Sequence, residues 1–172
     1  EKLFLEIQEI ESRIYDENHP TRAFAFNNLG LVYNRTGRHE EAIEQYKKAI
    51  AIREASLPEN HPMLAWTLDN LGLAYLDAGR PEEAIASIRR ALDIAMIAVG
   101  PDNADTGIVM ANLALVYREQ GDYDEAERLY RRVLEIDLKA FGHRHSETAS
   151  TLHNLGKVLY KQGQLERAEE LL

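Results

Sequence analysis

The sequence predicts an all-α protein built as a solenoid of antiparallel helix pairs, and three observations support this prediction. Short markers recur every 42 residues, apolar residues recur at helical spacing, and no stretch alternates in the manner of a strand. Self-similarity at a fixed period of this size is typical of a solenoid, in which each unit buries its apolar face only against its neighbours. The markers that share one register are Asn28, Asn70, Asn112 and Asn154, then Gly37, Gly79, Gly121 and Gly163, and then Ala42, Ala84, Ala126 and Ala168.

Each repeat unit is predicted to be a pair of helices. In the first unit, apolar residues from Thr21 to Thr36 recur at three- and four-residue steps, which places them on one face of a helix that Gly37 ends. A second helix is predicted from His39 to Ala55. Its first turn is acidic at Glu40 and Glu41, where carboxylates face the positive end of the helix dipole.

The repeat period divides the chain into one domain of consecutive units. The sequences Asn18-His19-Pro20 and Asn60-His61-Pro62 mark joints between units, because proline biases its predecessor away from helix. We expect a single repeat domain over residues 1–172, made of the second helix of a truncated unit (1–18), three repeats (19–60, 61–103 and 104–145) and a truncated fourth repeat (146–172).

Both ends of the chain are predicted to lack a cap. Residues 1–15 carry the apolar pattern of a second helix, with Phe4, Ile7, Ile10 and Ile14, and no first helix precedes them. Solenoids normally close with a helix that has a polar outer face. We therefore expect a fragment of a longer array, whose apolar ends could associate end to end with another copy.

Several markers together resemble a known repeat family. Leu29-Gly30, Tyr33, Gly37, Ala42, Tyr46 and Ala49 resemble the tetratricopeptide pattern, whose usual period is about 34 residues. The longer period is similar to the kinesin light chain type, and the segments 27–33 and 49–54 are close to that type. The resemblance implies a right-handed superhelix whose first helices line a concave groove for a protein or peptide ligand.

Two repeats depart from the pattern at tyrosine positions. Ile88 replaces the tyrosine that Tyr46 and Tyr130 predict, and Leu159 replaces the tyrosine of the other first helices. Both exchanges are apolar, so we expect the core to absorb them by local adjustment.

Composition narrows the classes of partner. The net charge is −9, and no repeat has the clustered Lys and Arg that a phosphate backbone requires, so we expect no nucleic acid partner. No apolar run approaches the roughly 18 residues of a membrane span, and no signal peptide pattern opens the chain. We therefore expect no membrane partner and a cytoplasmic location. The chain has no cysteine, which excludes a disulfide framework and a thiol nucleophile.

No residue pattern predicts an enzyme, a cofactor or a metal site. His19, His61 and His145 occupy one repeat position, so a role in turning the chain explains them better than catalysis does. His143 and His145 flank Arg144 in a loop with no carboxylate at ligand spacing, which makes a poor zinc site. The acidic pairs Glu40/Glu41, Glu82/Glu83 and Asp124/Glu125 recur in the first turns of second helices and are expected to complement the helix dipole.

The candidate site is the groove face of the first helices. Residues four before, three after and seven after each repeated asparagine lie with it on one side of the helix. The resulting stripes end in Arg35, Asp77, Glu119 and Lys161. From them we predict peptide-binding residues at Phe24, Asn28, Leu31, Trp66, Asn70, Leu73, Ile108, Asn112, Leu115, Asn154, Lys157 and Lys161.

Two alternatives remain open for these residues. The asparagine amides could satisfy polar groups of neighbouring helices, or they could hydrogen-bond the main chain of a peptide, since an amide both donates and accepts. The resemblance implies the second role, because kinesin light chain-type repeats use asparagines at this position for cargo peptides. Phe24, Trp66 and Ile108 could be buried in the core, or they could form an exposed apolar strip of the kind that marks binding sites.

A carboxylate clamp is not predicted. The tetratricopeptide repeats that grip a C-terminal carboxylate do so with lysine and arginine, and among the matching positions only Asn70 fits their pattern. The other matching positions hold Asn27, Leu31, Ile108 and Asn112.

These observations predict a protein-interaction module or scaffold that binds an extended or short helical peptide. Acidic residues of the ligand would lie near Lys157 and Lys161, and its aromatic or aliphatic residues over the apolar strip, as in the aromatic-acidic motifs of the resembled family. The alternative is a structural or regulatory arm of a larger signalling protein that contacts its own domains.

Overall fold

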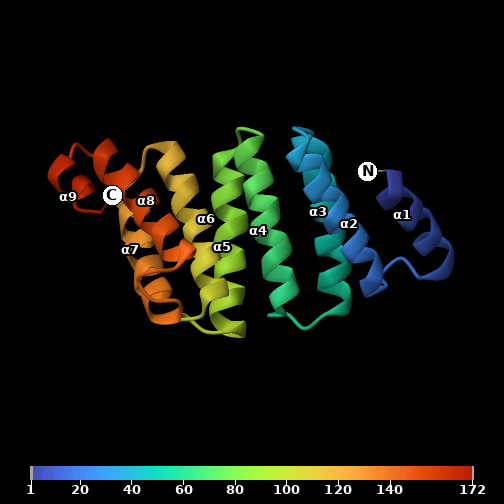
Figure 1. The fold of residues 1–172 in the computed structure, drawn as a ribbon. Helices are drawn as coiled ribbons and strands as arrows, with labels where there is room; N and C mark the ends of the chain where they lie inside the picture. The colour runs from blue at the N-terminus through green and yellow to red at the C-terminus, as the bar shows by residue number, and fades with distance from the viewer. Residues whose placement is uncertain (1, 172) are drawn as a thin grey trace. The chain divides into compact units, whose positions relative to one another are not determined.

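The structure is a computed structural model that describes residues 2–171, without the side chains of Phe4, Leu5 and Gln8. Within the described residues the chain forms nine α-helices and no strand, which confirms the all-α prediction (Figure 1). The helices belong to two compact units, Glu1–Ile94 and Ala95–Leu172, with the boundary inside one helix.

The helices alternate between first and second members of a pair, as the repeat predicts. The first helices are α2 (Pro20–Arg35), α4 (Pro62–Asp77), α6 (Ala104–Gln120) and α8 (Ser146–Lys161). The second helices are α1 (Lys2–Ile14), α3 (His39–Ser56), α5 (Pro81–Ala98), α7 (Tyr123–Ala140) and α9 (Leu165–Glu169). In the first unit α2 packs on α3 and α3 on α4, while in the second unit α6 packs on α7 and α7 on α8 (Figure 1).

One repeat position caps every first helix. His19 and His61 each accept a hydrogen bond at Nδ1 from the backbone N–H two residues later, at 3.3 and 3.2 Å, and the proline that follows each of them begins the helix. His145 does the same at 3.2 Å, and Asn103 uses its Oδ1 at 2.8 Å. These bonds satisfy a donor that the first turn leaves without a partner inside the helix. The predicted role of the histidines in turning the chain is therefore confirmed.

One glycine position ends every first helix. The predicted stop at Gly37 has φ of +77°, and the N–H of Arg38 bonds the Tyr33 carbonyl oxygen at 2.9 Å. This pattern is a Schellman motif, which needs a left-handed residue and so favours glycine. The other three first helices end in the same way, at Gly79, Gly121 and Gly163.

The core of each unit contains the repeated small and aromatic residues. In the first unit Ala42 and Tyr46 are buried, and in the second unit Ala126 and Tyr130 are buried in the same way. Burial raises the pKa of Tyr46, and it raises the pKa of Tyr130 to about 12, because the ionised phenol would lose its hydration.

The two departures from the tyrosine pattern are absorbed as expected. Ile88 is fully buried in place of a tyrosine, and Leu159 is buried where the other first helices have one. Tyr160, the next residue, points outward and is 64% exposed. Tyr160, one residue after the expected tyrosine position, therefore belongs to the surface and not to the core.

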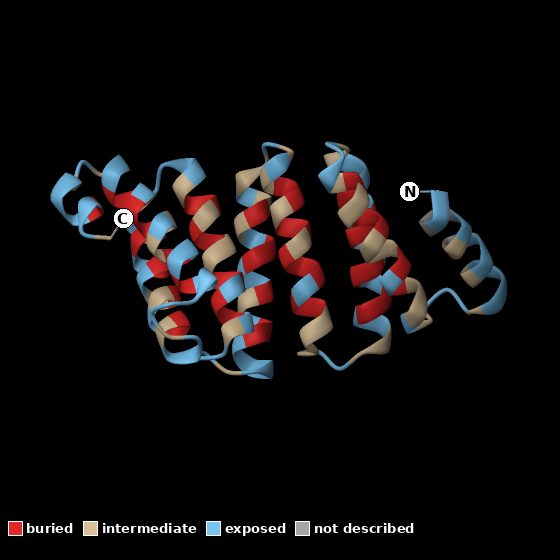
Figure 2. Cartoon of the chain, in the orientation of Figure 1, coloured by how far each residue is buried: buried red, intermediate tan, exposed pale blue. Residues whose placement is uncertain are grey.

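Helix α1 leaves an apolar face uncovered. It packs against α2, while Leu3, Ile10 and Ile14 are exposed. Figure 2 shows most of this helix as exposed. Phe4, which belongs to the same predicted pattern, lies outside the described side chains. End-to-end association through this face stays a prediction.

None of the helices in the described part of the chain is long and apolar enough to cross a membrane.

Candidate functional site

The predicted stripe of the first unit lies on an accessible face. Phe24 of α2 is 44% exposed and Trp66 of α4 is 52% exposed, so the interpretation of these aromatic residues as buried core is wrong. Asn28, Leu31, Asn70 and Leu73 are partly buried beside them. The first helices of the first unit therefore carry two exposed aromatic rings, with partly buried asparagines and leucines on the same helix faces.

The asparagine of α4 bonds a neighbouring first helix. Asn70 Nδ2 donates to Asn27 Oδ1 of α2 at 3.4 Å. At the end of the same helices, Asn34 Nδ2 donates to Asp77 Oδ2 at 2.8 Å. The proposed role of the repeated amide in joining neighbouring helices is thus observed at Asn70. The 3.4 Å bond to Asn27 uses one N–H of the Asn70 amide. The second N–H and the carbonyl oxygen of that amide can bond a ligand.

The stripe of the second unit is also accessible. Ile108 of α6 is 56% exposed, which excludes its burial in the core, and Lys157 of α8 is exposed. Asn154 Oδ1 accepts a hydrogen bond from Arg118 Nη1 of α6 at 3.2 Å. Asn112, Leu115, Asn154 and Lys161 complete the predicted set, the first three partly buried and the lysine exposed.

A cavity of about 280 Å³ lies between α6 and α8 of the second unit, over α7. We call it the Asp137 cavity, because that carboxylate lines it and is only 6% exposed. Ile108, Asn112, Leu115 and Asn154 of the predicted stripe line it as well.

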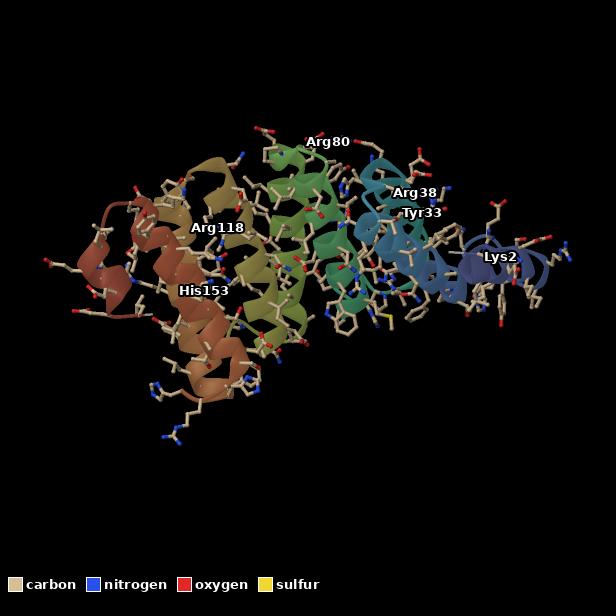
Figure 3. The ribbon with its side chains drawn as sticks, turned by 45° about the horizontal axis from the view of Figure 1, so that its top comes forward. Lys2, Tyr33, Arg38, Arg80, Arg118 and His153 are labelled. Atoms are coloured by element: carbon tan, nitrogen blue, oxygen red, sulfur yellow. The ribbon has the colours of Figure 1, made fainter. Side chains whose placement is uncertain are left out.

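A second cavity, of about 490 Å³, lies toward the C-terminal ends of α6 and α8. We call it the basic pocket, because Arg118, His153, Lys157 and Lys161 line it together with two tyrosines. Figure 3 labels Arg118 on α6 and His153 on α8. Glu119 also lines the pocket and pairs with Arg118 at 2.7 Å. The tyrosines are Tyr123 and Tyr160, so the pocket combines positive charge with aromatic surface.

Sequence reasoning missed two buried charges that occupy one repeat position. Arg53 of α3 is 4% exposed, bonds the Met63 carbonyl oxygen and the Thr67 hydroxyl, and lies 5.4 Å from the Phe24 ring. Its counterpart two periods later is Asp137, which accepts a hydrogen bond from Thr151 Oγ1 at 2.6 Å. The sequence did offer a signal for them. Two charged residues of opposite sign stand at one repeat position of the second helices, where the pattern otherwise predicts packing.

The acidic pairs of the second helices have structural partners. The Arg38 guanidinium lies 4.1 Å from the Tyr33 ring and bonds Glu41, and this bond holds the pKa of Glu41 below its usual value (Figure 3). Arg80 repeats the arrangement with the Tyr75 ring and Glu83, whose pKa is lowered for the same reason. These carboxylates therefore pair with cations of their own unit.

The histidines are not gathered with acidic residues. Within residues 2–171 no group of three His, Asp or Glu side chains could hold a metal ion. His145 caps α8 instead, and its ring stacks on Phe141 with the ring centres 4.5 Å apart.

Comparison with known proteins identifies the repeats. The family model for the tetratricopeptide repeat matches residues 1–55, 55–97 and 105–172. None of the curated proteins compared with the chain matches it.

Several solved structures share the fold. The kinesin light chain nearly identical TPR-like repeats of Podosopora anserina are 24% identical with a TM-score of 0.84, over 99% of this chain and 81% of that one. BtubC (BKLC) from P. vanneervenii is 24% identical with a TM-score of 0.88, over 99% and 68% of the two chains. The apo form of RapI is 20% identical with a TM-score of 0.83, over 98% and 58%.

At these identities the likenesses show the fold alone, and they confirm the predicted solenoid of helix pairs. The resemblance to kinesin light chain-like repeats is likewise supported. Because the family model matches almost the whole length, the chain belongs to the tetratricopeptide repeat family.

Proposed function

We propose that this chain is a protein-interaction module whose first helices bind an extended or short helical peptide. The observation that carries the proposal is the exposure of Phe24, Trp66 and Ile108 at one repeat position, each one turn before a half-buried asparagine. Exposed apolar side chains gathered beside polar groups are typical of binding surfaces, and tryptophan is a favoured hot-spot residue.

Within each unit the surface offers both kinds of contact that a peptide needs. The rings of Phe24 and Trp66 offer apolar area in the first unit, and Ile108 does so in the second. The half-buried amides can bond a peptide backbone, because each can donate and accept. Tetratricopeptide repeats and the similarity to kinesin light chain-like repeats support this class of function.

The basic pocket would bind an acidic side chain of the ligand. Three of its basic residues, His153, Lys157 and Lys161, lie at four-residue steps along one face of α8. Tyr123 and Tyr160 supply ring surface next to them. An aromatic residue followed or preceded by an acidic one would complement this pocket, which fits the aromatic-acidic motifs that the resemblance implies.

A peptide array followed by titration calorimetry tests the proposal. Peptides with aromatic and acidic residues should bind, and Asn70→Ala and Asn112→Ala should each weaken binding by about 1–3 kcal/mol, the cost of a lost buried hydrogen bond. The thermal melt of both variants should stay close to that of the wild-type protein. Glu44→Ala, which changes an exposed residue of α3, is the matched control and should leave binding unchanged.

The opposite pattern would contradict the groove mechanism. If both asparagine variants bound normally while Glu44→Ala or other changes on the second helices abolished binding, the ligand would lie elsewhere. If no peptide bound, the alternative of an arm that contacts domains of its own protein would replace this proposal.

A further inference from the structure

The Asp137 cavity contains a buried carboxylate that forms no ion pair with a cation among the described residues of the second unit. Glu127 lies in the same helix and is similarly buried, yet it pairs with Arg131 at 2.5 Å and with Arg167 at 3.5 Å. Asp137 has the Thr151 hydroxyl as its partner, and among the described residues no cation forms an ion pair with it. A buried carboxylate with only a neutral partner is costly, because a hydroxyl replaces little of its lost hydration.

The position of Asp137 in its helix increases this cost. It lies in the last turn of α7, where the helix dipole is negative and disfavours a carboxylate. The equivalent position in the first unit holds Arg53, whose charge suits that end of a helix and whose guanidinium lies near the Phe24 ring. Packing alone therefore does not account for an aspartate here.

The surroundings of Asp137 are suited to a positively charged ligand group. Ile108 and Leu115 give the cavity apolar walls, Asn112 and Asn154 line it with amides, and Glu147 adds a second carboxylate. The methylene chain of a lysine or arginine could lie against such walls while its charged end reached the carboxylate.

We propose that the Asp137 cavity is a subsite for a lysine or arginine side chain of the bound peptide, and that Asp137 selects that charge. This inference rests on the proposed function. The subsite lies along the N-terminal half of α8 and the basic pocket along its C-terminal half. One ligand would therefore place a basic residue in the subsite and an acidic residue in the basic pocket.

Helix geometry sets the spacing of those two charges. Thr151, the partner of Asp137, precedes Lys157 and Lys161 by six and ten residues, which corresponds to about 9 and about 15 Å along the helix axis. An extended peptide rises about 3.3 Å per residue, so its basic and acidic residues would be about three to five positions apart. Peptides with the two charges at this spacing are therefore the preferred ligands.

Fluorescence anisotropy with synthetic peptides tests the subsite on the full chain. The probes are short labelled peptides with one aromatic residue, one glutamate and one lysine at this spacing, in both orders, each paired with a version that has norleucine in place of lysine. The wild-type protein should bind the better lysine peptide about tenfold more tightly than its norleucine version, the effect expected of a charge-assisted hydrogen bond. Asp137→Asn, whose amide can still accept from Thr151, should abolish that preference and leave norleucine binding unchanged.

Glu135→Gln is the matched control, because it removes the same charge from an exposed position of the same helix. It should keep the preference for lysine. Equal binding of lysine and norleucine peptides by the wild-type protein would overturn the subsite and leave the proposed function standing. Failure of every peptide to bind would overturn both.

Discussion

At the scale of single residues, buried polar groups distinguish positions that serve the fold from those that serve a ligand. Tyr46 and Tyr130 occupy one repeat position, are buried in their units, and fill the space beneath the first helices. Asp137 is buried to a similar extent but carries a charge that no described cation pairs with. The first two residues are explained by packing, while the third is explained by the peptide subsite that we propose.

The buried tyrosines predict a loss of stability at high pH. An unfolded tyrosine ionises near pH 10, whereas burial raises the native pKa of Tyr130 to about 12 and raises that of Tyr46 as well. Between these values the unfolded state binds fewer protons than the native state, so the free energy of unfolding falls as pH rises. Circular dichroism melts from pH 8 to 11.5 should show this fall.

Replacing a buried tyrosine by phenylalanine should reduce this fall in the free energy of unfolding with pH. Tyr130→Phe should lose less stability between pH 8 and 11.5 than the wild-type protein, whereas Tyr160→Phe, at an exposed position, should behave like the wild type. An equal fall in all three proteins would show that Tyr130 does not titrate differently in the native state.

At the scale of helices, the close crossing of first and second helices depends on small residues. A Cβ atom added at Gly72 of α4 would clash with Ile88 Cγ1 and would lie 3.2 Å from the Ala84 carbonyl oxygen of α5. The repeat-equivalent position in the second unit holds Ala114, which is fully buried without glycine. The requirement for glycine is therefore set by the local partner and differs between repeats.

Gly72→Ala should accordingly be destabilising. Forcing α4 and α5 apart should lower the free energy of unfolding by about 1–3 kcal/mol, as overpacking of a core usually does. Chemical denaturation measures the loss, and adding Ile88→Val should restore part of it by removing a methyl group from the clash. A Gly72→Ala protein as stable as the wild type would mean that the two helices can separate without penalty.

The order and bounds of the helices could be predicted because their signals are local. Gly37 and its equivalents specify the left-handed turn that ends each first helix, and proline after His19 and His61 specifies where a helix begins. The role of Asn103 as a fourth cap was missed, because its residue type differs from the histidines at the same repeat position. Its side chain nevertheless accepts a hydrogen bond from the backbone N–H two residues later, as theirs do.

The candidate site could be predicted only in part. Helical spacing predicted which residues share the stripe face. It did not predict that Phe24, Trp66 and Ile108 are exposed, because exposure depends on how neighbouring helices pack. The two cavities and the link between Asn154 and Arg118 join residues of different helices, and the lining of each cavity comes from three helices. Arg53 and Asp137 lie in second helices, outside the stripe, so a search confined to first helices could not find them.

At the scale of the whole molecule, function is assigned to the first helices of both units. The first unit offers two exposed aromatic rings, and the second offers Ile108 with two cavities. A peptide that contacted the first helices of both units would gain affinity from contacts that are individually modest, because the later contacts form within one complex.

The emission of Trp66 tests this central claim most directly. It is the only tryptophan of the chain, it is half exposed, and it lies on the proposed surface, so its fluorescence reports on that surface alone. Titration with an aromatic-acidic peptide that contains tyrosine and no tryptophan should shift the emission to shorter wavelength and reduce quenching by acrylamide, because the bound peptide would exclude water from the ring. If calorimetry showed saturation by the same peptide while the emission and quenching of Trp66 stayed unchanged, the peptide would not contact the surface of the first unit, and the proposed binding role of Phe24, Trp66 and the asparagines beside them would be wrong.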